Sequence, residues 1–166
     1  MSPVSKNDED AVRRQWDQLI EMSLGGDGKS LNDFISLNLA DELWREAAIG
    51  HLIRTCGHIS ETATAEKIWA LVNISILDTP KQTESLIRFF ENKWAELCGI
   101  TEKPSDERKA SNINESGTGL LTLLAHLRTE KAVKYLEEIV ARSENCSWQS
   151  VAIEFLSLAR RLASIR

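Results

Sequence analysis

The chain has 166 residues, of which 42% are hydrophobic and 27% are charged, and its formal net charge at pH 7 is −5. This length suits one domain, and a chain of this size buries enough surface to fold without a metal or a disulfide. The 20 Lys and Arg residues are outnumbered by 25 Asp and Glu residues and form no basic stripe, which argues against a nucleic-acid partner. Three prolines and the scarcity of runs of Val, Thr or Tyr argue against an all-β chain.

The N-terminus and the cysteines favour a cytoplasmic protein. Residues 1–10 are polar and acidic and lack the apolar core of a secretory signal, and no apolar run approaches the length of a membrane span. Cys56, Cys98 and Cys146 are odd in number and widely spaced, which is typical of reduced thiols rather than of a disulfide framework. We therefore expect three reduced cysteines, a cytoplasmic location and no membrane partner.

Apolar residues at helical spacing predict five helices in the first part of the chain, at about residues 7–24, 30–39, 41–55, 61–77 and 80–98. Asn7, Ser30 and Thr79 are suitable N-cap residues for three of them. Gly57 and Gly99 stand where the third and fifth helices should end.

Residues 100–119 interrupt this pattern. Between positions 102 and 112 the segment is charged and has almost no large apolar side chain, which is typical of an exposed or disordered loop. Three helices should follow at about 120–127, 129–140 and 147–166, the last two with Thr129 and Ser147 as N-caps. We therefore predict a single all-α domain, residues 1–166, of about eight helices, with a loop at 100–119.

Two stretches of the chain share the pattern W-x-x-small-A-I-x-x-L, at residues 44–52 and 148–156. Residues 124–140 resemble the helix-turn-helix core of short HEAT-like repeats of the phycobilisome-lyase type, and the stretches that begin at Trp44 and Trp148 look like first helices of such repeats. The resemblance covers about residues 41–78 and 117–164 and implies an α-α superhelix. If helices alternate strictly from the third one, the last helix is the second member of a pair, whereas its sequence looks like a first member. One helix should therefore be missing or degenerate within 100–119. An irregular helical bundle is the alternative.

Two clusters that look like chemical sites have simpler explanations. Residues 23–30 nearly match a phosphate-binding loop, but Ser23 replaces its first glycine and a helix, not a strand, precedes it. His51, Cys56 and His58 lie near one helix end, but structural zinc needs four ligands and a nucleophilic Cys-His pair needs an orienting group. We expect no metal, no cofactor and no catalytic residue.

Acidic residues at the start of the third predicted helix and on the seventh, together with two tryptophans, are the candidates for a protein-binding surface. Carboxylates gathered on one face attract a basic partner, and tryptophans are enriched in binding hot spots, although core packing is their default role. The candidate protein-binding residues are Asp41, Glu42, Trp44, Glu46, Glu137, Glu138 and Trp148.

Stacked helical repeats offer extended surfaces for partners, so our main hypothesis is a non-enzymatic protein-binding scaffold. The acidic charge and small size would suit an inhibitor or immunity-type protein that masks a basic toxin or enzyme. A nucleic-acid-binding or base-processing HEAT-like module is one alternative, and a structural homodimer is another. The sequence leaves open whether the protein is a monomer or a homodimer.

Overall fold

The computed structural model of the protein describes residues 6–75 and 80–165, and in these ranges it contains eight α-helices and no strand. In chain order the helices are α1 (Lys6–Leu24), α2 (Gly28–Asn38), α3 (Glu42–Thr55), α4 (Thr62–Ile74), α5 (Pro80–Cys98), α6 (Glu107–His126), α7 (Glu130–Arg142) and α8 (Gln149–Ala163). The predicted all-α class is confirmed.

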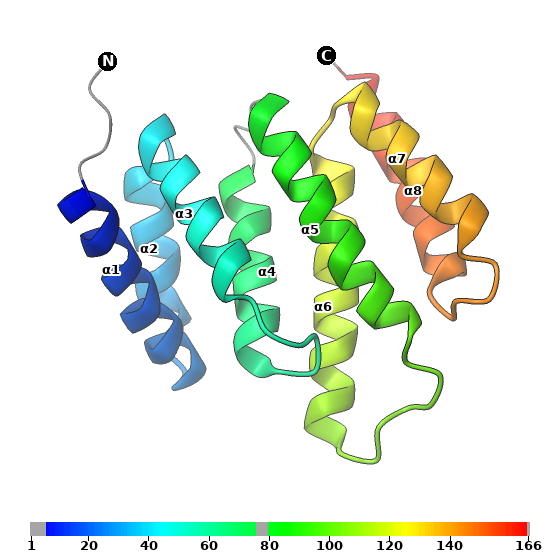
Figure 1. Ribbon diagram of the computed structural model, residues 1–166, viewed down its shortest axis with the longest axis horizontal. Helices are drawn as coiled ribbons and strands as arrows, with labels where there is room; N and C mark the ends of the chain where they lie inside the picture. The colour runs from blue at the N-terminus through cyan, green and yellow to red at the C-terminus, as the bar shows by residue number, and fades with distance from the viewer. Residues whose placement is uncertain (1–5, 76–79, 166) are drawn as a thin grey trace.

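The helices form two rows, as Figure 1 shows. In this view α1, α3, α5 and α7 lie in front, and α2, α4, α6 and α8 lie behind them. The chain runs alternately down the front row and up the back row, so the four front helices point the same way. Helix α6 is central because it packs along both α4 and α8, whereas the front neighbours α3 and α5 barely touch each other. From α4 to α8 the back row is therefore packed more tightly than the front row from α3 to α7.

Side-chain caps start four of the helices. Asp27, Asp41, Asp106 and Thr129 each accept hydrogen bonds from backbone N–H groups of the first turn that follows. The prediction for Thr129 is confirmed, but Ser30 lies inside α2, and α1 already begins one residue before Asn7. The last helix has Trp148 rather than Ser147 at its N-cap and makes no side-chain cap bond. The cap predicted at Thr79 lies outside the described residues.

The loop predicted at 100–119 is wrong for most of its length, because α6 begins at residue 107. Asp106 accepts hydrogen bonds from the backbone N–H groups of Arg108 and Lys109 and so starts the helix. Two small polar residues that made the segment look exposed are in fact buried. Their side chains donate hydrogen bonds to the loop between α3 and α4 and hold it in place. Asn112 Nδ2 donates to the carbonyl oxygen of Ser60 at 2.9 Å, and Ser116 Oγ donates to that of Ile59 at 2.9 Å.

Two glycines of α6 allow neighbouring helices to approach its backbone. A Cβ atom at Gly119 would lie 2.8 Å from Cγ2 of Ile68 on α4, and one at Gly117 would lie 2.5 Å from Cη2 of Trp148 at the start of α8. Real Cβ atoms essentially never make contacts this short. These glycines therefore serve helix packing and do not break the helix.

The two stretches that share a sequence pattern do not occupy equivalent places in the stack. Trp44 lies inside α3, in the front row, whereas Trp148 precedes α8, which lies in the back row as the partner of α7. Strict alternation therefore holds, and no helix is missing within 100–119, because the helix predicted at 120–127 already begins at residue 107 as α6. The shared pattern reflects common helix-packing needs rather than a common position.

Aromatic residues fill the two halves of the core. Trp16, Phe34 and Trp44 pack together with ring centroids 5.4–5.7 Å apart, and Phe90 stacks on Trp94 at 5.3 Å. The expected core role of the tryptophans is confirmed for Trp16, Trp44 and Trp94, which are at most 7% exposed.

Cys98 and Cys146 form a disulfide, with their Cα atoms 5.0 Å apart, and Cys56 is free. The prediction of three reduced thiols is therefore wrong for two of them, because their separation in sequence gives no sign that the end of α5 meets the turn between α7 and α8. The expected cytoplasmic location loses the support that it drew from reduced cysteines. No helix in the described ranges has the length and apolarity needed to cross a membrane.

Candidate functional site

A groove of about 640 Å³ lies between α3 and α5. Ile49, Ile53 and Phe89 supply its apolar surface. The other lining residues are small or polar: Glu46, Gly50, Arg54, Cys56, Gln82, Ser85, Arg88, Asn92 and Lys93. Ligand sites are commonly about 300–1,000 Å³ and combine an apolar lining with a few polar groups, so this groove has the size and composition of a binding site.

The groove exists because α3 and α5 stay apart in front while α4 and α6 pack tightly behind them. Gly50 lies midway along the α3 wall, where it adds no side chain to the groove. The guanidinium group of Arg54 folds back over it, with Nη1 only 3.2 Å from where a Cβ of residue 50 would lie. The bare backbone at Gly50 thus leaves room that this mobile side chain occupies.

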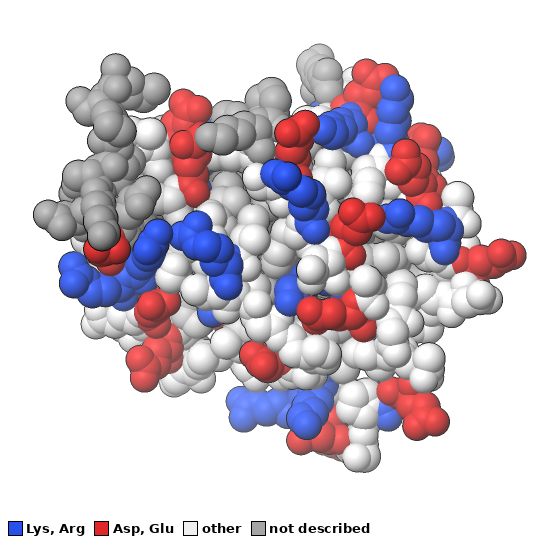
Figure 2. All heavy atoms as spheres, in the orientation of Figure 1, with Lys and Arg blue, Asp and Glu red and all other residues white. Residues whose placement is uncertain are grey.

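Two exposed arginines border the groove from opposite walls, Arg54 on α3 and Arg88 on α5. Figure 2 shows basic groups on both sides of an uncharged strip between these helices, while acidic and basic groups alternate over the rest of this face. The pKa of Glu84 is lowered mainly by its hydrogen bond to Lys131, and Arg88 adds a smaller effect. The border of the groove is therefore locally basic in a protein that is acidic as a whole.

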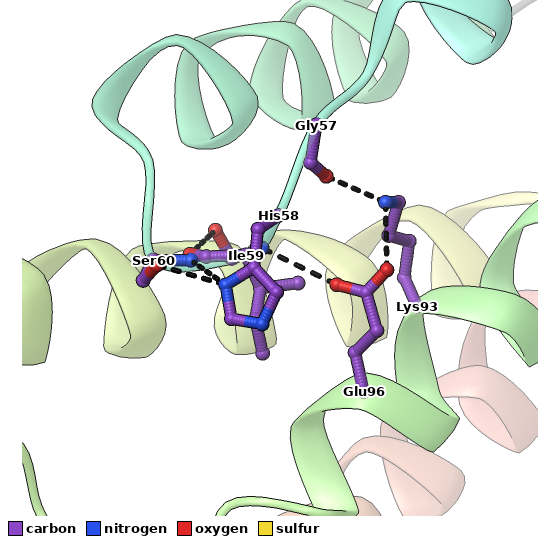
Figure 3. Close-up of polar contacts among 7 residues, drawn as sticks. Gly57, His58, Ile59, Ser60, Lys93 and Glu96 are labelled. Carbon is purple, nitrogen blue, oxygen red and sulfur yellow. Dashed lines mark hydrogen bonds and ion pairs between the residues drawn. The ribbon is translucent and has the colours of Figure 1, made fainter.

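A buried lysine lies at one end of the groove, and Figure 3 shows its polar contacts. Lys93 Nζ donates to the carbonyl oxygen of Gly57 at 2.5 Å and pairs with Glu96 Oε1 at 3.0 Å. The other oxygen of Glu96 accepts from the backbone N–H of Ile59 at 3.4 Å. The charge of Lys93 is therefore used to hold the α3–α4 loop against α5.

Cys56 lies at this end of the groove and is the only free thiol in the chain. Burial raises the pKa of Cys56, and the opposing effect of Lys93 is smaller. Because the thiolate is the nucleophilic form, a protonated Cys56 is a poor nucleophile at neutral pH.

The structure gives different roles to the candidates at the start of α3. Asp41 is the N-cap of the helix, with Oδ1 accepting from the N–H groups of Leu43 and Trp44 at 3.0 and 3.2 Å. Trp44 is 7% exposed and packs in the core, so it offers no surface to a partner. Glu42 is exposed, and Glu46 alone among the seven candidates lines the groove.

The candidates near α7 and α8 lie at other places. Glu137 pairs with Arg160 at 3.3 Å, and Glu138 borders a separate hollow beside Tyr135. Trp148 is half-buried against α6 and lines a hollow next to the α5–α6 loop. The structure therefore does not gather the seven candidates into one site.

Sequence reasoning missed the groove and its arginines. Arg54 and Arg88 belong to helices that are not adjacent in sequence, and isolated arginines on exposed helix faces carry no special pattern. The one local signal is Gly50, a glycine in the middle of a helix where it costs stability.

The histidine and cysteine cluster has structural roles. His51 is buried and shares a hydrogen bond between Nε2 and Asp17 Oδ1 of 2.9 Å, which ties α3 to α1. His58 Nδ1 lies 2.8 Å from Ser60 Oγ within the α3–α4 loop. Among the described residues, no group of three or more His, Cys, Asp or Glu side chains is placed to hold a metal ion.

No protein-family model matches the chain, and comparisons with curated proteins and with solved structures find no significant match.

Proposed function

We propose that the protein is a non-enzymatic scaffold that binds another protein through its front face, centred on the α3–α5 groove. The observation that carries this proposal is an apolar groove with an arginine on each wall. Protein interfaces have apolar centres with polar rims, and arginine is enriched in them. An inhibitor or immunity-type protein with a HEAT-like framework is one form that such a scaffold would take.

The contrast with the neighbouring pair of front helices supports this choice of surface. Helices α5 and α7 are joined by two ion pairs, Lys131–Glu84 at 2.7 Å and Arg142–Glu91 at 3.0 Å. These pairs occupy four of the charged groups along that junction. The α3–α5 junction holds the groove of about 640 Å³, where a partner can reach the half-buried Ile53.

A capture experiment with a blocked groove tests the proposal. Asn92→Trp places a large side chain in the groove, and Asn32→Trp makes the same change at an exposed position of α2 that lines none of the hollows described above. The wild type and Asn32→Trp should retain the same protein from a lysate, and Asn92→Trp should lose it. Retention by Asn92→Trp, or no specific partner over a range of salt concentrations, would contradict the proposal.

A homodimer is the second candidate, favoured by exposed apolar side chains on the back row. Leu37 on α2 is 84% exposed and Ile153 on α8 is 51% exposed. Light scattering over a dilution series should then show a dimer that Leu37→Glu dissociates. A constant monomer mass at all concentrations would remove this candidate.

A further inference from the structure

We infer that the α3–α5 groove selects a partner segment that is itself acidic and apolar, with carboxylates beside a large apolar side chain, although the whole protein is acidic. This inference rests on the proposed function and names the chemistry of the partner at the same site. It depends on which charges around the groove are free to bind.

Arg54 is the cation most available to a ligand. Within the described residues it makes no hydrogen bond or ion pair, and its guanidinium group rests on the backbone at Gly50. A guanidinium group binds a carboxylate through two parallel hydrogen bonds. Arg54 can therefore bind a partner carboxylate without first breaking a hydrogen bond to another acceptor.

Arg88 faces the groove from the opposite wall. The two acidic groups nearest to it along α5 already have partners, because Glu91 binds Arg142 at 3.0 Å and Glu84 binds Lys131 at 2.7 Å. Because those carboxylates are occupied, most of the hydrogen-bonding capacity of Arg88 remains open to a ligand. The two arginines can thus hold carboxylates on both sides of a bound segment.

The remaining charges of the groove leave its border basic. The ammonium group of Lys93 is committed to Gly57 and Glu96, and among the described lining residues Glu46 is a single carboxylate against Arg54 and Arg88. A basic partner would bring its cations next to two guanidinium groups, and like charges placed together cost affinity.

The floor of the groove sets the apolar part of the specificity. Ile49 and Phe89 form the buried apolar floor of the groove, at 3% and 5% exposed, and the half-buried Ile53 is the apolar side chain most open to a partner. Helices α3 and α5 point the same way in Figure 1, so the groove runs along them and suits a helix laid between them. Amphipathic helices bind such grooves through an apolar stripe.

Three synthetic peptides of about 15 residues, the length at which helices begin to be stable in water, provide the probes. All carry the same stripe of Leu and Phe, flanked by Glu in the first peptide, Gln in the second and Lys in the third. Binding is measured by the fluorescence anisotropy of a label, at low and at high salt. The Glu peptide should bind most tightly, the Gln peptide more weakly and the Lys peptide least.

Protein variants show whether the arginines cause this order. Arg54→Gln and Arg88→Gln should each weaken the Glu peptide by roughly fivefold, which corresponds to about 1 kcal/mol, and should change the Gln peptide little. Arg161→Gln is the matched control, because Arg161, like Arg54, is an exposed arginine in the last turn of its helix. Thermal unfolding of each variant checks that it remains folded.

Three results would overturn the inference: equal or tighter binding of the Lys peptide, unchanged binding of the Glu peptide to the Arg54 and Arg88 variants, or no binding of any peptide. Each of these leaves the scaffold proposal to the capture experiment, which uses no peptide. Failure of the capture experiment together with selective peptide binding would mean that the groove serves a different role.

Discussion

Replacing Gly119 by alanine adds a methyl group where α6 crosses α4, at the tightest helix contact in the stack. The new Cβ would lie 2.8 Å from Cγ2 of Ile68 and 3.2 Å from Nε1 of Trp69. Ile68 is fully buried, so its side chain has nowhere to move. Gly50→Ala is the matched control, because there the nearest atom belongs to the flexible end of Arg54.

Two opposing effects set the expected change in the free energy of unfolding. Overfilling a packed core costs about 1–3 kcal/mol, while alanine is better than glycine inside a helix by about 0.5–1 kcal/mol. We expect Gly119→Ala to lower the free energy of unfolding by about 1 kcal/mol, a fall in Tm of about 2–4 °C for a chain of this size. Gly50→Ala should instead raise it by about 0.5 kcal/mol, since the guanidinium group can turn away.

Urea unfolding followed by circular dichroism measures both variants against the wild type. A double variant with Ile68→Ala, which removes the clashing methyl group, shows whether the clash is the cause. In that background the cost of Gly119→Ala should shrink or change sign. Equal stabilisation by Gly119→Ala and Gly50→Ala would refute the reasoning, because the packing of α4 on α6 would then play no part.

Three further predictions concern bonds and charges described above. Cys98→Ser removes the disulfide and should lower the free energy of unfolding in a urea titration by about 2–4 kcal/mol, because the bond closes a long loop. Cys56→Ser should have a much smaller effect in the same titration. Equal losses in the two variants would argue against the pairing. Burial, reinforced by Glu91, raises the pKa of Tyr135 to about 12, so absorbance of the single tyrosine should show ionisation well above pH 10 in the folded protein and at lower pH in Glu91→Gln. The protonated phenol stabilises the fold below about pH 10, and this contribution is lost as pH rises toward 12; a titration midpoint near 10 would contradict it. Lys93→Met should lower the free energy of unfolding by about 2 kcal/mol, because it leaves a carboxylate and a carbonyl oxygen without their donor. It should also speed hydrogen exchange in residues 56–61. Unchanged exchange would count against the role of Lys93 in holding the loop.

Most helices follow from local sequence, and the exceptions have physical causes. Apolar spacing and a capping residue such as Thr129 act within one helical turn, so they can be recognised directly. The second half of α6 was predicted at 120–127, but its first half was missed because it buries small and polar groups, Asn112 and Ser116 among them, whose partners lie in a distant loop. Asp106 followed by Glu107 was the available sign of a helix start, and the charge and the lack of large apolar side chains between positions 102 and 112 outweighed it.

The candidate site was less accessible to sequence reasoning than the fold. Carboxylates were chosen because they cluster in sequence, at the start of α3 and on α7, yet Asp41 is used as a cap and Glu137 in an ion pair. The groove depends on the distance between α3 and α5, which is set by how their partners α4 and α6 pack behind them. Such a distance is a property of the stack, and no single segment encodes it.

The disulfide makes the two ends of the stack differ in how easily they unfold. In a stack of helix pairs each pair is held by its neighbours, so unravelling starts most easily at an end. The bond between Cys98 and Cys146 fastens the turn of the last pair to α5, whereas the pair α1–α2 at the other end contains no cysteine. Under force or partial denaturation the protein should therefore come apart from its first pair and keep its C-terminal half folded longest, so that loss of α1 would expose one flank of α3 before the groove itself was lost.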